Sequence, residues 1–353
     1  MILNVNTNTG SYPIHIERGL LSRVSELIGL GRRRVCIVTD SGVPKQYVEA
    51  VASQCIEPLL FCFPSGEQNK NFDTYRSLLD ALLRADFDRS DAIIAVGGGV
   101  VTDLAGFAAA TYMRGIDFYN VPTTLLSQVD ASVGGKTAVD FDGYKNMIGA
   151  FWQPRAVLID PLTLDTLPRR RVSDGLAEVI KMALTCDGAL FEAMERIDLL
   201  PKSCADGMLH LPEEIDEIIA QALRIKIGVV ENDEREAGLR RVLNFGHTLG
   251  HAIESCEGLS ELYHGECVAL GMLPMCSDEV RARLVPVLAK CGLPHTLADL
   301  PERTELMIAL KHDKKAVGKT ISAVFVPAVG KYAFESRTPE ALLDLLEQTA
   351  NKC

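Results

Sequence analysis

Three histidines close together in this sequence have the side chains best suited to bind a metal ion. His247 and His251 stand four residues apart in the run Asn-Phe-Gly-His-Thr-Leu-Gly-His, and His264 follows in His-Gly-Glu. On an α-helix a spacing of four places both imidazoles on one face, about one turn apart. A buried imidazole needs a partner, and a divalent cation with a carboxylate as a further ligand would satisfy the set. The alternative is a group of hydrogen-bonded residues that pack helices. The zinc-protease pattern is excluded, because no Glu follows the first His.

A carboxylate that could complete such a site stands in Leu-Ala-Glu-Val-Ile-Lys, where Glu178 and Lys181 are three residues apart on an otherwise apolar helical face. Glu178 is therefore a candidate metal ligand. The alternative is an intrahelical ion pair, which stabilises a helix by only about 0.2–0.5 kcal/mol.

A glycine triplet suggests a second kind of site. The apolar run 92–96 leads into Gly97-Gly98-Gly99, and an Ala-rich helix is predicted to open at Thr102-Asp103. Glycines let backbone N–H groups approach a pyrophosphate, and a helix N-terminus carries partial positive charge. This order predicts phosphate or dinucleotide binding, although it is not the G-x-G-x-x-G pattern. The alternative is a plain tight turn.

Polar residues gather between 111 and 149, where a core region would have few. They are Arg114, Asp130, Lys136, Lys145 and Asn146. Lys136 follows two glycines, so backbone and ammonium could approach one anion, and Lys145-Asn146 is predicted to lie in a turn-rich loop. The alternative is a solvated loop with ordinary surface lysines.

The elements expected around these residues alternate between strand and helix up to residue 160. Residues 1–18 read as a hairpin, 72–85 as a helix, and strands are expected at 34–39, 58–63, 92–96, 117–121 and 156–159. Such alternation predicts a mainly parallel sheet. Asp40, at the carboxyl end of one strand, stands where a carboxylate meets ribose hydroxyls in dinucleotide folds. A hydroxyl-capped helix is expected to start at Thr123-Thr124.

Beyond residue 161 the pattern becomes helical, so we expect a domain boundary there, with domains 1–160 and 161–353. Helical spacing is present at 172–186, 213–230, 238–257 and 264–284, with a short strand pair at 321–326 and 332–334.

Composition limits the possible functions. The chain has 353 residues and a net charge of -11, which argues against a nucleic-acid surface. No run of about 18 apolar residues is present, so we expect no membrane span. The N-terminus lacks the features of a secretion signal, and none of the ten cysteines form Cys-x-x-Cys. We therefore expect a cytoplasmic protein with free thiols.

A series of motifs in this order resembles 3-dehydroquinate synthase, of the sugar-phosphate cyclase superfamily. The motifs begin at residues 97 (Gly-Gly-Gly-Val-Val-Thr-Asp), 111 (Thr-Tyr-Met-Arg-Gly), 134 (Gly-Gly-Lys-Thr), 145 (Lys-Asn-Met-Ile-Gly), 175 (Gly-Leu-Ala-Glu-Val-Ile-Lys), 243 (Leu-Asn-Phe-Gly-His-Thr), 264 (His-Gly-Glu) and 313 (Asp-Lys-Lys). The resemblance extends from about residue 35 to 326.

The resemblance implies a Rossmann-like α/β domain that binds NAD, an all-α C-terminal domain that binds metal and substrate, and a homodimer. It implies conversion of 3-deoxy-D-arabino-heptulosonate 7-phosphate to 3-dehydroquinate and phosphate, a step of the shikimate pathway toward chorismate and aromatic amino acids. The reaction steps that the resemblance implies are transient oxidation of the substrate by NAD, elimination of phosphate, re-reduction, ring opening and intramolecular aldol closure.

The resemblance also implies roles for individual residues. The ligands of a divalent metal, zinc or cobalt, would be Glu178, His247 and His264. His251 would then not bind the metal but would lie on the side of the site that faces the substrate phosphate. The residues near NAD would be Asp40, Glu67, Lys70, Gly98, Gly99, Asp103, Thr123, Thr124, Asp130, Lys136 and Lys145. The residues near substrate would be Arg114, Asp130, Lys136, Lys145, Asn146, Lys181, Lys226, Arg240, Asn244, His251, Lys314 and Lys315. Catalytic roles would fall to Lys136, Asn146, Glu178, Lys181 and His251, and Arg114 would reach the phosphate from its own or the other subunit.

Some positions depart from the family pattern, namely Gly42, Thr102, Ala138, Asp140, Asp142, Tyr144 and Asp174. Three alternatives remain: a sugar-phosphate cyclase of the 2-epi-5-epi-valiolone or 2-deoxy-scyllo-inosose type, a metal-dependent polyol dehydrogenase, and a non-catalytic NAD-binding protein. Arg240 and Asn244 favour dehydroquinate, because the other cyclases act on substrates without the carboxylate.

Overall fold

The computed structural model describes residues 1–200, 208–256, 262–298, 300–311, 316–317 and 320–351. The chain forms two compact units, each of two segments: Met1–Leu167 with Lys226–Arg235, and Pro168–Ile225 with Glu236–Cys353. The boundary expected near residue 161 stays a prediction.

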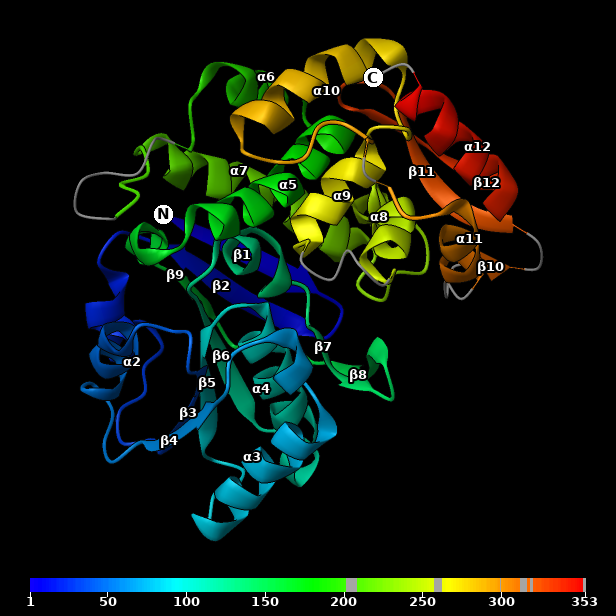
Figure 1. The fold of residues 1–353 in the computed structure, drawn as a ribbon. Helices are drawn as coiled ribbons and strands as arrows, with labels where there is room; N and C mark the ends of the chain where they lie inside the picture. Colours follow the sequence, from blue (N-terminus) through cyan, green and yellow to red (C-terminus); the bar gives the residue numbers. More distant parts are fainter. Residues whose placement is uncertain (201–207, 257–261, 299, 312–315, 318–319, 352–353) are drawn as a thin grey trace. The chain divides into compact units, whose positions relative to one another are not determined.

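The first unit is built on a seven-stranded sheet, visible in Figure 1. Its strands are β1 (Ile2–Thr7), β2 (Gly10–Ile16), β3 (Val35–Asp40), β4 (Leu59–Phe63), β5 (Ala92–Gly97), β6 (Asp117–Pro122) and β9 (Val157–Ile159). They lie in the order β1-β2-β9-β6-β5-β3-β4, and every pairing except β1 with β2 is parallel. The predicted hairpin and parallel sheet are confirmed.

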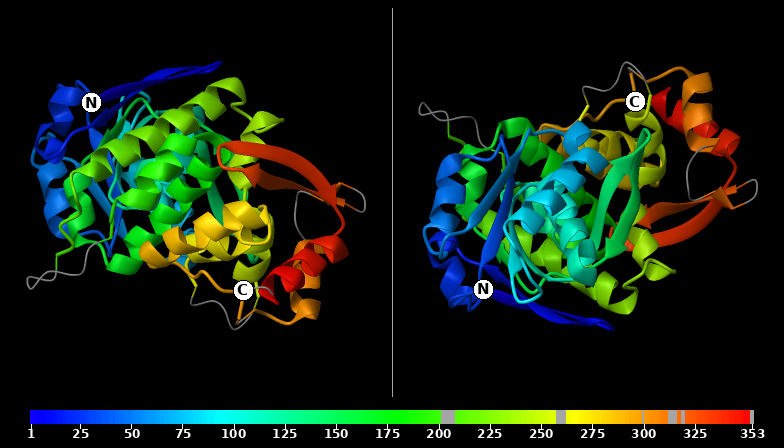
Figure 2. Two further views of the ribbon diagram at one scale, coloured as in Figure 1. Left: turned by 90° about the horizontal axis from the view of Figure 1, so that it is seen from above. Right: turned by 90° about the horizontal axis from the view of Figure 1, so that it is seen from below.

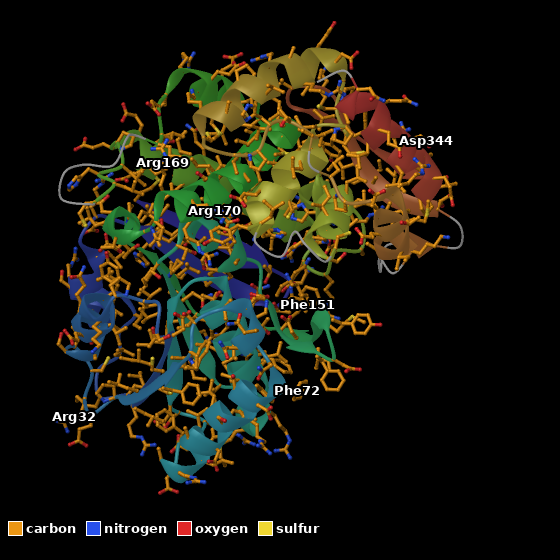
Figure 3. All side chains as sticks on the ribbon, in the orientation of Figure 1. Arg32, Phe72, Phe151, Arg169, Arg170 and Asp344 are labelled. Atoms are coloured by element: carbon orange, nitrogen blue, oxygen red, sulfur yellow. The ribbon has the colours of Figure 1, made fainter. Side chains whose placement is uncertain are left out.

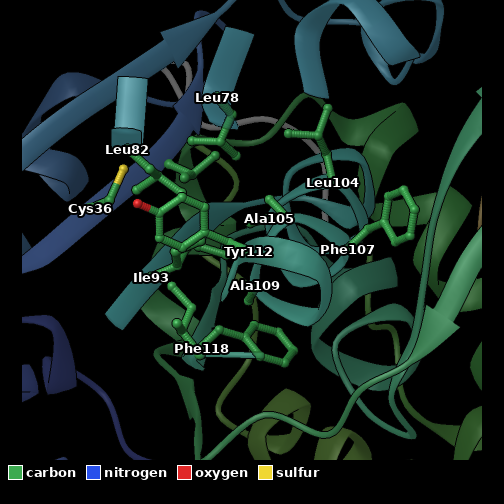
Figure 4. Packing of buried hydrophobic residues seen from close by; sticks show 14 of the residues in the cluster. Cys36, Leu78, Leu82, Ile93, Leu104, Ala105, Phe107, Ala109, Tyr112 and Phe118 are labelled. Carbon is green, nitrogen blue, oxygen red and sulfur yellow. The ribbon is translucent and has the colours of Figure 1, made fainter. Parts of the chain in front are cut away.

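The interior strand β5 is buried along its whole length. A parallel strand covered by helices on both faces reads as a continuous apolar run, which is the pattern of Ala-Ile-Ile-Ala-Val. The helices of this unit are α1 (Val24–Leu27), α2 (Lys45–Ala52), α3 (Phe72–Arg84) and α4 (Gly99–Thr111). Figure 4 shows one of the resulting cores, in which Leu78 and Leu82 pack near Tyr112 and Phe118.

The glycine triplet belongs to regular structure rather than to a loop. Gly97 ends β5, Gly98 is the N-cap of α4, and Gly99 is its first residue. The expected start of this helix at Thr102 was wrong by one turn. The reason is local, because a glycine N-cap lets the chain enter the helix directly from the strand. The first turn of α4 therefore begins at the carboxyl edge of the sheet.

Lys145 and Asn146 lie in a strand, so the predicted turn-rich loop was wrong. β7 (Lys136–Phe141) pairs antiparallel with β8 (Tyr144–Phe151). Asp142 and Gly143 connect them with φ angles of 50° and 79°. Two consecutive left-handed residues form the tight turn that suits hairpin twist, and Asp-Gly is a preferred pair there.

The second unit is mainly helical, as predicted. Its helices are α5 (Arg169–Cys186), α6 (Gly188–Arg196), α7 (Glu214–Asn232, with the first unit from Lys226 on), α8 (His247–Glu254), α9 (His264–Met272), α10 (Asp278–Lys290), α11 (Arg303–Lys311) and α12 (Pro339–Ala350). The expected strand pair is confirmed and enlarged. β11 (Thr320–Ala328) lies between β10 (Ala316–Val317) and β12 (Lys331–Arg337), the orange-red strands of Figure 2.

Two expected helices are interrupted. The stretch 238–257 divides into a 3-10 helix, Leu239–Asn244, and α8, because Gly246 at φ 77° breaks the helical path. The stretch 264–284 divides into α9 and α10, and the side chain of Ser277 caps the new helix by accepting from the N–H of Val280. Among the described residues no helix has the length and apolarity needed to cross a membrane.

Candidate metal and dinucleotide sites

Glu178 is the centre of a polar cluster inside the helical unit. Its side chain is fully buried on α5, and Lys181 donates a hydrogen bond to Oε2. The other oxygen, Oε1, has no hydrogen-bond partner among the described residues. Nε2 of His247 lies 3.6 Å from this oxygen and Nε2 of His264 lies 3.7 Å from it. Both distances exceed a hydrogen bond.

A divalent ion fits this arrangement. Tetrahedral zinc with ligands at about 2.0–2.2 Å holds neighbouring ligand atoms about 3.3–3.6 Å apart. The two nitrogens stand at nearly this spacing from Glu178 Oε1. A buried carboxylate oxygen without a hydrogen bond is costly unless a ligand satisfies it. The residues present are therefore suited to hold the metal that the sequence implied.

Both imidazoles are oriented by a bond to the other ring nitrogen. Nδ1 of His247 lies 3.1 Å from the carbonyl oxygen of Phe245, and Nδ1 of His264 lies 3.1 Å from Oε2 of Glu254. An acceptor at Nδ1 fixes the proton there and leaves the Nε2 lone pair available for a cation.

The surroundings of His264 favour positive charge. Burial lowers the pKa of this imidazole, but the hydrogen bond and charge of Glu254, with Glu178 and Asp174, outweigh burial and raise the pKa to about 9. The same carboxylates would attract a bound metal ion.

His251 lies beside the two proposed ligands. The three histidines offer one nitrogen each within 4.8 Å of one another, and the ring centroids of His247 and His251 are 5.2 Å apart. The predicted single helical face is confirmed, because both residues belong to α8. His251 is the exposed member of the trio, which suits the expected role toward substrate.

Three helices that carry candidate metal ligands or their neighbours approach closely at glycine residues. A Cβ on Gly265 would stand 2.2 Å from the carbonyl oxygen of Asp174 on α5, and a Cβ on Gly271 would stand 2.0 Å from that of Gly246 beside α8. Only glycine permits these approaches, so α9 can place His264 next to Glu178.

The N-terminus of α9 is also fixed by side chains. Oδ1 of Asp174 accepts the N–H of Gly265 at 2.6 Å, and burial raises the pKa of this carboxyl. Arg170, labelled in Figure 3, donates two hydrogen bonds to the carboxylate of Glu266, at 2.6 and 2.7 Å, and stacks on the ring of Tyr263.

In the first unit, residues expected near NAD lie at the carboxyl edge of the sheet. The strand order reverses between β3 and β5, and open α/β sheets bind ligands at such a point. Asp40 ends β3, while the N-cap Gly98 follows β5. A Cβ on Gly98 would stand 3.0 Å from Thr124 Cγ2, next to the buried Thr123. The hydroxyl of Thr124 accepts the N–H of Ser127, as expected of a cap.

A second cluster in this unit surrounds the buried ammonium of Lys70. Its Nζ lies 2.6 Å from Glu67 Oε1 and 3.3 Å from Asp103 Oδ2, and it donates to Asn146 Oδ1 at 2.8 Å. Asp140 is 4.0 Å away and accepts the backbone N–H of Asn146 at 2.8 Å. The cluster thus brings together four residues that were expected in the site with Asp140, which was not expected there. The four are Glu67, Lys70, Asp103 and Asn146.

The pKa values in this cluster reflect burial and charge. Burial raises the pKa of Asp103 to about 6, Lys70 opposes the rise, and the charge of Glu67 adds to it. Burial lowers the pKa of Lys70, but the charges of Asp103 and Glu67 outweigh burial and raise it overall.

The other expected substrate residues are dispersed over both units. Lys226 donates to the carboxylate and to the carbonyl oxygen of Asp130. Lys136 begins β7 and Lys145 lies in β8, both exposed. In the second unit Arg240 is buried, and Asn244 donates to Glu236 at 2.8 Å. Lys314 and Lys315 lie outside the described residues.

Arg114 stands far from the dinucleotide edge. It follows α4, whose 13 residues rise about 20 Å from Gly98. Its side chain is exposed, and both Met113 and Arg114 have positive φ angles, 50° and 70°. Such angles are strained for residues other than glycine.

Sequence reasoning missed Glu254, Asp140 and Glu236 as partners of site residues. A signal existed for Glu254, because it stands seven residues after His247 and so repeats the helical face of the histidines. No comparable local signal points to Asp140 or Glu236, whose partners lie six and eight residues away outside any α-helix.

Comparisons with known proteins cover nearly the whole chain. Residues 60–174 match the model of the 3-dehydroquinate synthase N-terminal region, and residues 175–316 match that of the C-terminal region. A 3-dehydroquinate synthase of Streptococcus suis (strain 05ZYH33) is 42% identical, over 98% of this chain and 100% of that protein. One from Pelobacter propionicus is 41% identical, over 98% of both.

Solved structures share the fold. The 2-epi-5-epi-valiolone synthase of Streptomyces hygroscopicus subsp. jinggangensis 5008, with NAD+ and Zn2+ bound, has a TM-score of 0.84 at 26% identity over 97% of both chains. A 2-deoxy-scyllo-inosose synthase with carbaglucose-6-phosphate, NAD+ and Co2+ has a TM-score of 0.87 at 24% identity, over 99% of this chain and 100% of that one. These likenesses confirm the expected fold class.

Proposed function

The chain belongs to the 3-dehydroquinate synthase family, and we propose from this premise that it converts 3-deoxy-D-arabino-heptulosonate 7-phosphate to 3-dehydroquinate and phosphate. The observation that carries the proposal is the unsatisfied Glu178 Oε1 facing two imidazole nitrogens at 3.6 and 3.7 Å. It supports a divalent metal, and the carboxyl edge of the parallel sheet supports NAD.

We assign the metal to Glu178, His247 and His264. A metal held by these residues would supply a positive charge that favours ionisation of a substrate hydroxyl, and a bound NAD would supply reversible hydride transfer, so the reaction would have no net oxidation. Lys181 holds one oxygen of Glu178 by a hydrogen bond and so directs the other toward the imidazoles.

The basic residues bind the two anionic groups of the substrate. We assign donors for a carboxylate and a phosphate in each unit separately: Lys136 and Lys145 in the first, and Arg240, Asn244 and His251 in the second. An acidic chain would otherwise repel these anions. Donors held in place before the reaction stabilise developing charge without reorganisation. The phosphate itself, held by this group, can accept the proton lost during its own elimination.

A phosphate-release assay tests the activity. Heptulosonate phosphate should yield inorganic phosphate only with NAD and metal present, with no net change in absorbance at 340 nm. A polyol dehydrogenase would instead accumulate NADH. Release from a substrate that lacks the carboxylate, with none from the heptulosonate, would favour another cyclase.

We also propose a cytoplasmic homodimer in which Arg114 serves the site of the partner subunit. The support is the exposed guanidinium at the end of α4 remote from Gly98, presented by two residues with positive φ. Strained backbone of this kind is retained where function requires a particular presentation.

Mixing two inactive variants tests this arrangement. Arg114→Ala and Lys136→Ala should each be inactive alone, but refolded together they should recover about a quarter of parental activity, because half of the dimers are mixed and each has one intact site. No recovery would place Arg114 in the site of its own subunit, whereas an Arg114→Ala variant that is active alone would place Arg114 outside both sites.

A further inference from the structure

The helix α8 carries a third polar side chain in line with its two histidines. His247, His251 and Glu254 are spaced by four and three residues, so they share one stripe of the helix. Glu254 is the last residue of α8, and His264 is the first of α9. The carboxylate of Glu254 reaches Nδ1 of His264 at 3.1 Å.

This contact decides which nitrogen of His264 is available. With a carboxylate as acceptor, Nδ1 keeps its proton, so Nε2, which lies 3.7 Å from Glu178 Oε1, is the nitrogen left to bind a cation. His247 has the same arrangement with a neutral acceptor, the carbonyl of Phe245. The two imidazoles therefore differ in the charge behind them.

We propose that Glu254 is the positioning residue of His264 and that its negative charge strengthens metal binding. The inference rests on the proposed function, because it takes Glu178, His247 and His264 as the ligands. A carboxylate hydrogen-bonded to a ligating imidazole fixes the ring and makes the metal-binding nitrogen more basic.

A purely structural role would be to tie α8 to α9, but other contacts already do this. Gly250 and Gly271 bring the backbones of α8 and α9 within contact distance. The side chain of Asp174 on α5 separately holds the N–H of Gly265, at the start of α9, at 2.6 Å. With both helices fixed in this way, the bond from Glu254 adds the orientation of the imidazole ring.

The experiment measures zinc affinity in metal-free protein by competition with a chromophoric chelator, without substrate. Glu254→Gln keeps an acceptor and removes the charge, whereas Glu254→Ala removes both. We expect zinc to bind about 10-fold more weakly to the first and up to about 100-fold more weakly to the second. The matched control is Glu192→Gln, an exposed carboxylate of α6, which should bind zinc like the parent.

NAD affinity and the circular dichroism of each metal-free variant verify the fold. If folded Glu254→Gln and Glu254→Ala bind zinc within about twofold of the parent, the proposal is overturned; should the Ala variant not fold, the Gln variant decides alone. If the parent binds no zinc, the ligand set and this role fail together. Affinity that depends on Glu254 in a protein that releases no phosphate from the heptulosonate would reject the proposed function and support this inference.

Discussion

The two units bury opposite charges. In the first, the cation Lys70 lies among carboxylates, and in the second, the carboxylate Glu178 lies among a lysine and imidazoles. Both side chains are almost inaccessible, 3% and 0% exposed. The central charge is thus positive in the first cluster and negative in the second, and each is surrounded by groups that can carry the opposite charge.

The clusters differ in whether the protein alone satisfies the central group. Lys70 has Glu67, Asp103 and Asn146 within hydrogen-bonding range, so its three donors are accounted for. Glu178 has Lys181 on one oxygen and no hydrogen bond on the other among the described residues. A buried group that the fold leaves unsatisfied marks where a ligand belongs, whereas a satisfied one stabilises the fold itself.

The largest effect should come from Glu178→Gln. Activity should fall more than about 100-fold, since losing even the partner of a metal ligand typically costs 10–100-fold. Metal content of the purified variant should fall with activity, while NAD affinity measured by fluorescence stays parental. Full activity of the metal-free Glu178→Gln variant would show that the Glu178 cluster, like the Lys70 cluster, does not need a metal ion.

Lys70→Met should chiefly affect stability. Removing one partner of a buried ion pair costs about 3–5 kcal/mol, here because Glu67, Asp103 and Asp140 lose their common cation. Lys70 holds the pKa of Asp103 down, so its loss raises that pKa further above its ordinary value. A raised carboxyl pKa gives stability that is greatest at low pH and is lost as pH rises through the folded value.

Urea unfolding at pH 5.5 and pH 8 measures this dependence. The deficit of the Lys70→Met variant relative to the parent should be larger at pH 8, where Asp103 is ionised. An equal deficit at both values would mean that Asp103 does not titrate in this range. Glu192→Gln serves again as the control for a change of surface charge.

Metal removal should destabilise only one unit. Metal at 100 times its dissociation constant stabilises the folded state by about 2.7 kcal/mol. On chelation, hydrogen exchange should accelerate in α5, α8 and α9 and stay unchanged in β5 and α4. Uniform acceleration across both units would show that the metal stabilises more than the helical cluster.

Asp140→Asn should have the smallest effect. The amide oxygen can still accept the N–H of Asn146, and only a charge 4.0 Å from Lys70 is lost. Stability should change by less than about 1 kcal/mol. Because Asp140 contributes to the raised pKa of Asp103, the pH at which stability declines should move lower. An unchanged pH profile would exclude coupling between these carboxyls.

Much of the architecture was predictable from local patterns. Buried parallel strands such as β5 are continuous apolar runs, and the pairing of His247 with His251 follows from helical spacing. The assignment of Glu178, His247 and His264 as ligands came from resemblance to a family, and the distances to Glu178 Oε1 give it a physical basis.

One error had a local cause, whereas the features that no local pattern predicts depend on contacts between residues distant in sequence. The Asp142-Gly143 turn was readable but was overlooked, which misplaced Lys145 in a loop. By contrast, no residue near Gly265 in the sequence indicates that Gly265 will lie against Asp174 of α5, which is 91 residues away. Gly265 contacts the carbonyl oxygen of Asp174 and donates its N–H to the side chain of the same residue. The network around Lys70 likewise joins residues up to 76 positions apart.

The divided first unit has a consequence for biosynthesis. Lys226 returns 96 residues after Asp130 to bond with it, and Glu231 and Glu234 accept hydrogen bonds from Asn6 and Thr9 in the N-terminal hairpin. A ribosome adding roughly 5–20 residues per second needs about 5–20 s to cover that interval. A nascent chain released before residue 235 would lack part of the segment Lys226–Arg235 that completes the first unit. Such a truncated chain would be recognised by chaperones and proteases.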